Sequence, residues 1–143
     1  MAIYSLSTNT TVTTTAAPAY DAKASSSNQP RVMEFGINLG AATSSTYGIG
    51  RSANTPTQTS PVTVLAENYN DPAGQTTTAV AWTTAPTVPT NFFRRVALPA
   101  TIGAGIIWTF PRGLILQSSG PSFTLWNLAT NSASTNVHIV VDE

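Results

Sequence analysis

Apolar and polar residues alternate with a period of two along most of the chain beyond residue 30. The alternation is clearest at residues 33–39 and 137–142, where every second side chain is apolar. A period of two places successive side chains on opposite faces of a β-strand. Similar segments occur at residues 62–67, 76–84, 92–98, 106–110, 113–117 and 122–128. Because no stretch has the i, i+3, i+4, i+7 spacing of an amphipathic helix, the pattern predicts strands with almost no helix.

Proline and glycine separate these segments. The chain has ten prolines and nine glycines, spread at intervals typical of the turns between short strands. This spacing predicts an all-β fold, an antiparallel β-sandwich of jelly-roll type. The residues expected to face its core are Phe35, Ile37, Val64, Val96, Ile107, Leu114, Leu116, Phe123, Leu125, Val137, Ile139 and Val141.

The first 30 residues lack this pattern. Ser7–Ala17 consists almost entirely of Thr, Ser, Asn and Ala, and Ala22–Pro30 has the composition of a flexible connector. We therefore expect two parts, an extended N-terminal arm and linker at residues 1–30 and the sandwich domain at residues 31–143. An extended, uncharged arm could add a strand to the sheet edge of a neighbouring subunit. The apolar side chains expected to anchor it there are Ile3, Tyr4, Leu6 and Val12.

The low charge of the chain narrows the possible functions. Only 8% of the residues are charged, and six basic and six acidic side chains cancel, whereas a typical soluble domain is about 25% charged. A neutral surface of this kind favours association with other proteins. We expect no nucleic-acid partner, because there is no basic stripe, and no membrane partner, because no apolar run reaches about 18 residues. The N-terminus lacks the features of a signal peptide, which predicts synthesis in a cytoplasm.

Residues able to carry catalysis are few. The single histidine, His138, lies on the outward phase of its strand, and the chain has no cysteine. Glu34 and Glu67 could face each other, but any two outward carboxylates look alike in a sequence. Residues 68–71 could hold Ca²⁺, although Asn and Asp at these positions are more typical of a turn. We therefore predict no catalytic residues, no metal site, no cofactor and no enzymatic activity.

Residues suited to a protein interface are easier to find. Trp126 lies on the opposite phase to Phe123 and Leu125, so it is expected either under a second layer or against a partner. Arginine outnumbers lysine five to one, and its planar guanidinium is favoured at interfaces. The remaining interface candidates are Arg94, Arg95, Arg112 and Trp126.

Three C-terminal segments resemble a known family. They are residues 108–116 (WTFPRGLIL), residues 122–128 (SFTLWNL) and residues 137–143 (VHIVVDE), which end in two acidic residues. Together they are similar to the C-terminal half of the small jelly-roll proteins that decorate tailed-bacteriophage heads, known as decoration or cement proteins. The similarity covers about a quarter of the chain, and its motifs are packing motifs.

This resemblance implies a virion protein without catalysis. Its partners would be the major capsid protein and further copies of itself, as a homotrimer at local threefold positions of the capsid surface, where it would stabilise the shell. Two alternatives share the same β-pattern and low charge. One is a phage tail, fibre or receptor-binding module, and the other is a small lectin-like binding module.

Overall fold

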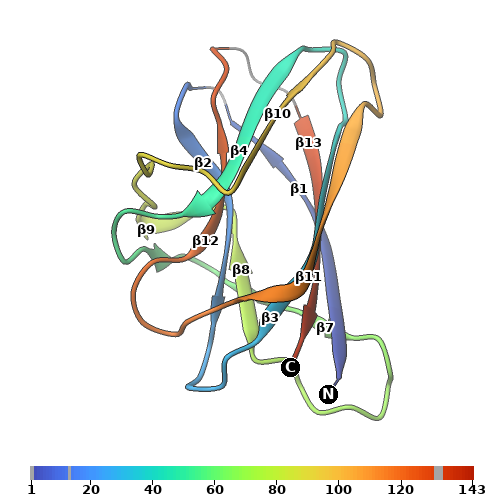
Figure 1. Cartoon of the computed structure of the whole chain (residues 1–143), viewed down its shortest axis with the longest axis vertical. Helices are drawn as coiled ribbons and strands as arrows, with labels where there is room; N and C mark the ends of the chain where they lie inside the picture. Colours follow the sequence, from blue (N-terminus) through green and yellow to red (C-terminus); the bar gives the residue numbers. More distant parts are fainter. Residues whose placement is uncertain (1, 13, 131–133) are drawn as a thin grey trace.

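The protein is an antiparallel β-sandwich, as the alternation predicts (Figure 1). The computed structural model describes residues 2–12, 14–130 and 134–143. Within these ranges there is no helix, and hence no helix long enough to cross a membrane.

In the described part of the chain, thirteen strands form two large sheets and a small ribbon. Sheet A contains, in spatial order, β11 (Gly105–Ile115), β3 (Arg31–Leu39), β13 (Ser134–Asp142), β1 (Ile3–Thr11) and β7 (Leu65–Ala66). Sheet B contains β10 (Arg94–Leu98), β4 (Ser45–Arg51), β12 (Phe123–Asn127), β2 (Ala17–Ala24), β8 (Thr76–Ala79) and β6 (Val62–Thr63). The ribbon pairs β5 (Thr57–Gln58) with β9 (Trp82–Thr84).

The pairing of the eight principal strands is that of a jelly roll. β1 pairs with β13, β2 with β12, β3 with β11 and β4 with β10, all antiparallel. The chain thus behaves as one long hairpin that is wrapped around itself, so that successive pairs fall alternately in sheet A and sheet B. Pairing of β13 with β3 joins the two strand pairs of sheet A, and pairing of β12 with β4 joins those of sheet B. This arrangement confirms the expected fold class.

The core lies between the sheets and is centred on aromatic rings. Phe35 is fully buried and contacts Tyr20, Trp108 and Phe123, with ring centroids 5.7, 6.4 and 5.1 Å away. The predicted core positions that are buried are Phe35, Ile37, Val64, Leu116, Phe123, Leu125, Val137, Ile139 and Val141, while Val96 and Leu114 are partly buried against the core.

The prediction for Ile107 was wrong, because its side chain is 59% exposed. Trp108 and Phe110 are buried, so they set the inward phase of β11, and Ile107 points outward. Adjacent isoleucines at 106 and 107 left this phase ambiguous in the sequence.

The division at residue 30 also requires correction. Residues 3–24 are extended, but they belong to the domain: β1 pairs with β13 at nine positions, and β2 lies between β12 and β8. The side chain of Tyr4 is buried, and the Thr10 hydroxyl donates to the Ala19 carbonyl at 2.6 Å. Threonine favours strands, and a satisfied hydroxyl can be buried, so a Thr-rich segment can form a strand of the sandwich with few apolar residues.

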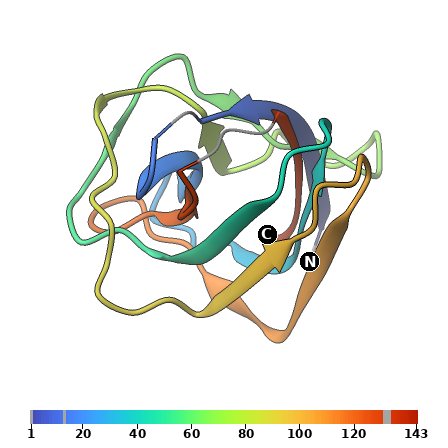
Figure 2. The ribbon, with the colours of Figure 1, turned by 90° about the horizontal axis from the view of Figure 1, so that it is seen from above.

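The 42 residues between β4 and β10 extend the edges of both sheets, and parts of this segment cover the outer side of sheet B (Figure 2). This segment, residues 52–93, adds β7 beside β1 and β8 beside β2. It then brings Phe92 against Trp126, with ring centroids 5.7 Å apart. Glycine is needed at position 48, because a Cβ there would lie 2.7 Å from the Phe92 ring. The outer side of sheet B is therefore a second interior layer.

Candidate interaction surface

The outer side of sheet A is accessible, in contrast to the covered outer side of sheet B. We call the outward side chains of its strands β1, β13, β3 and β11 the open face. Apart from Gly36, they are exposed or half-buried. Strand pairing places them in rows across the sheet. The rows are Asn9, Asn136, Asn38 and Gly105; Ser7, His138, Gly36 and Ile107; and Ser5, Val140, Glu34 and Thr109.

The first row is a ladder of asparagines. Asn9 Nδ2 donates to Asn136 Oδ1 at 3.1 Å, and Asn136 Nδ2 donates to Asn38 Oδ1 at 3.0 Å. Asn9 Nδ2 also donates to Ser134 Oγ at 2.9 Å. Cross-strand hydrogen bonds of this kind hold neighbouring side chains together across the strands. The ladder therefore presents an uncharged strip of amide groups.

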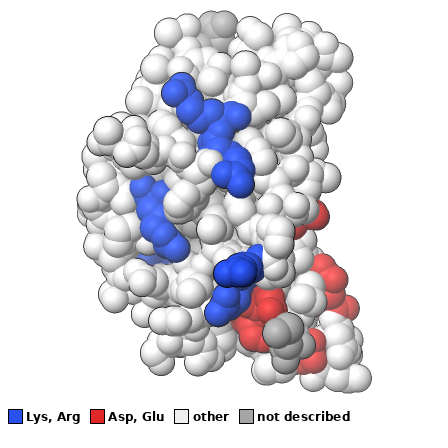
Figure 3. Space-filling view, viewed as in Figure 1, with Lys and Arg blue, Asp and Glu red and all other residues white. Residues whose placement is uncertain are grey.

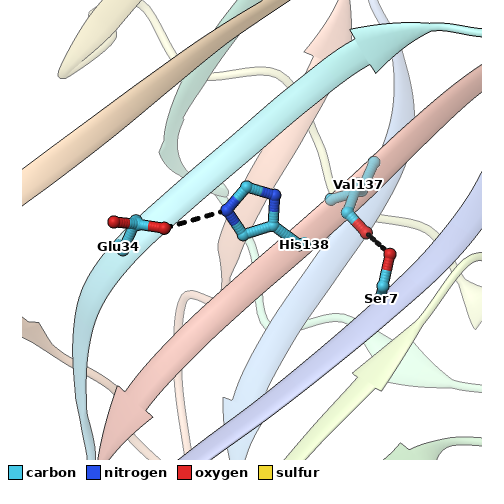
Figure 4. Close-up of polar contacts among 4 residues, drawn as sticks. All are labelled: Ser7, Glu34, Val137 and His138. Carbon is cyan, nitrogen blue, oxygen red and sulfur yellow. Dashed lines mark hydrogen bonds and ion pairs between the residues drawn. The ribbon is translucent and has the colours of Figure 1, made fainter.

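The second row holds the only histidine of the sequence (Figure 4). His138 Nε2 lies 3.0 Å from Glu34 Oε1, and both side chains are about one-third exposed. The imidazole lies over Gly36, where an added Cβ would be 1.9 Å from the ring. Glycine at position 36 thus allows the histidine to lie flat and reach the carboxylate. An exposed pair of this kind contributes little to stability. Its main effect is to hold both side chains close to the surface of the sheet.

Charge is sparse over the molecular surface. Figure 3 shows basic side chains in a few separate groups and acidic side chains toward the end where the termini lie. The basic group nearest that end adjoins acidic side chains, and most of the remaining surface is uncharged. A surface with few charges can be covered by another protein at a low cost of desolvating unpaired charges.

The predicted interface residues divide into two groups. Tyr4 and Trp126 are buried, and Leu6 and Val12 pack partly buried against the core, so these four are not available as surface anchors. Tyr4 also donates from its hydroxyl to the Pro72 carbonyl at 3.0 Å. Of the two roles left open for Trp126, the structure shows the covered one.

The other candidates remain on the surface. Ile3 is exposed at the start of β1, and Arg94, Arg95 and Arg112 are exposed. Arg95 lies over the Phe92 ring, 5.5 Å from its centroid. None of these four lies among the three rows of the open face. The open face itself was missed because Asn, Ser and Thr on outward phases look like ordinary solvated positions.

The acidic candidates have local roles. Glu34 contacts His138, whereas Glu67 follows β7 and its backbone N–H donates to the Ile3 carbonyl at 2.9 Å. Residues 68–71 form a turn, in which the Asn70 N–H donates to Asn68 Oδ1 at 3.2 Å. Across residues 2–12, 14–130 and 134–143, no three His, Cys, Asp or Glu side chains are grouped as metal ligands.

One buried carboxyl joins the covering segment to sheet B. Asp21 on β2 is fully buried, and its Oδ1 accepts a 2.9 Å hydrogen bond from Gln58 Nε2 of β5. Burial raises the pKa of the Asp21 carboxyl, against opposing effects of Gln58, Trp82, Ser122 and Lys23. The sequence did not single out Asp21, because burial by residues 52–93 is a tertiary effect.

The raised pKa of Asp21 predicts a particular pH dependence. Between its unfolded value, about 3.9, and its folded pKa, the folded protein binds more protons than the unfolded chain. The contribution of Asp21 to stability is therefore greatest at low pH and is lost as the pH rises through the folded pKa. Urea unfolding of the natural chain and of Asp21→Asn should show the natural chain losing stability relative to the variant with rising pH. A constant difference across this range would contradict the assignment.

Sequence comparison identifies no relative. No family model matches the chain, and no curated protein is similar in sequence. A functional assignment therefore depends on the geometry of the open face.

Proposed function

We propose that the chain is a non-enzymatic virion structural protein that binds the outer surface of a phage head and stabilises the shell, as a decoration or cement protein. The observation that supports this proposal most directly is the asymmetry of the two sheets. Sheet B is covered by residues 52–93 of its own chain, whereas sheet A leaves its outward side chains accessible. The free face is suited to contact with another protein.

The chemistry of the open face favours a broad protein surface over a small ligand. Apart from the His138–Glu34 pair, the side chains in its three rows are amides, hydroxyls and aliphatic groups. Cross-strand hydrogen bonds hold the ladder formed by Asn9, Asn136 and Asn38. Polar groups with these geometries can exchange hydrogen bonds with a partner, directly or through water. The proposed partners are the major capsid protein and further copies of this chain. Jelly-roll domains also occur in lectins, so the fold alone does not decide the function.

Co-sedimentation with purified phage heads that lack the protein tests the proposal. The natural chain should pellet with the heads, and Asn136→Arg should weaken binding by at least about tenfold, because a long charged side chain would interrupt the amide ladder at the interface. Ser119→Arg is the matched control, since Ser119 is an exposed loop residue away from the open face and should bind normally.

Two results would contradict the proposal. Equal binding by Asn136→Arg and the natural chain would exclude the open face as the attachment surface. Failure of the natural chain to bind heads, together with retention on a glycan array, would favour the lectin-like alternative.

A further inference from the structure

We propose that two copies of the chain associate through the first half of β11, with Ile107 of each copy facing its counterpart across a twofold axis. This inference goes beyond the proposed function, because it concerns the free protein whether or not it binds a shell. The contact would join two copies of sheet A edge to edge and extend the open face across both.

β11 is an edge strand of sheet A. Among the residues that the structure describes, its one strand partner is β3, although β11 is eleven residues long. Leu39 N–H donates to the Ala104 carbonyl, and the register pairs Ile106 with Ile37 and Trp108 with Phe35. Because hydrogen-bonding direction alternates along an antiparallel strand, the N–H and C=O groups of residues 105, 107 and 109 face the free side. These groups are available to a further strand.

The other sheet edges are protected against such pairing. At one edge of sheet B, β10 carries the exposed Arg94 and Arg95; at the other, β6 has only two residues. On sheet A, β7 is equally short, and the free part of β1 beyond Leu6 carries Ser, Thr and Asn side chains. Natural proteins use short strands, charges, prolines and bulges to block edge pairing.

β11 has such protection only in its second half. Pro111, Arg112 and Gly113 follow one another there, and the register with β3 shifts between Thr109 and Leu114. The first half has none: residues 96–111 contain no charged side chain, and Ile102 and Ile107 are 69% and 59% exposed. An unprotected, apolar and neutral edge is what strand addition requires.

The first half of β11 is also complementary to itself. With Ile107 on the twofold axis, Gly105 would face the second copy's Thr109, and Ile106 would face the second copy's Trp108. The two Ile107 side chains would meet as a β-branched cross-strand pair, which is a stabilising combination. No charges would oppose each other, and the Arg112 side chains would lie at opposite ends of the contact. These features identify a second copy of the chain as the occupant.

Sedimentation equilibrium on the natural chain tests this inference. The expected mass is twice 14.9 kDa. Ile107→Lys should weaken dimerisation by at least about tenfold, because it brings two like charges together and restores an edge lysine. Leu65→Lys is the matched control, since Leu65 is 65% exposed on the short edge strand β7, and this variant should remain dimeric.

A cysteine variant gives an independent readout, because the natural chain has no cysteine. Directly opposed residues of paired strands have Cα atoms about 5.5 Å apart, within the range of a disulfide. Ile107→Cys should therefore form a covalent dimer on mild oxidation, and Leu65→Cys should not. A monomeric or trimeric natural chain, or a dimer that Ile107→Lys leaves intact, would overturn the inference. Neither experiment involves phage heads, so a negative result would overturn the dimer without contradicting the proposed function.

Discussion

Removal of residues 1–17 is expected to abolish cooperative folding of the whole domain. β1 supplies the partner of β13 along its full length, and Tyr4 fills part of the core. Without β1, the central strand β13 would become an edge, and the apolar side chains between the sheets would be exposed to water. Circular dichroism and urea unfolding of the truncated chain should show loss of the cooperative transition.

A control separates loss of the strand from a change in surface chemistry. Replacing the outward residues Ser5 and Ser7 by threonine keeps β-propensity and leaves the inward side chains in place, so this variant should remain folded. If the truncated chain unfolded at the same urea concentration as the natural one, residues 1–17 would be a separate arm after all.

The second large effect is expected at Phe35. Phe35→Ala should reduce the free energy of unfolding by about 3–5 kcal/mol, because it removes the ring that Tyr20, Trp108 and Phe123 surround and leaves a cavity between the sheets. Urea denaturation measures the change. Val88→Ala is the control, since Val88 is already 36% exposed and its truncation should cost far less. A loss below about 1 kcal/mol at Phe35 would mean that the aromatic cluster is not the centre of the core.

The sequence predicted the strands whose inward positions are large and apolar. Residues 33–39 and 137–142 are examples, because every second side chain there is an aliphatic or aromatic group that can only be placed in a core. The same rule fails at the N-terminus. The inward positions of β2 are Tyr20 and small alanines such as Ala22, which fit opposite the Phe35 cluster. In the sequence alone, these small residues resemble a linker.

Surfaces were harder to predict than strands. Trp126 has the same outward phase whether a partner or its own chain covers it, and only the path of residues 52–93 brings Phe92 against it. The amides of Asn9, Asn38 and Asn136 are widely separated in the sequence, so their ladder depends on the register of three strands. A local pattern contains no information about such a register until the topology is known.

We propose that this jelly roll attaches to a protein shell through the open face of sheet A. Electron cryomicroscopy of phage heads with and without the added protein would show which face lies against the shell. The proposal predicts additional density on the outer surface of the shell, into which the sandwich fits with β1, β13, β3 and β11 toward the capsid and the covered outer side of sheet B away from it. Heads that gain no density, or density that fits only with the outer side of sheet B against the shell, would contradict it.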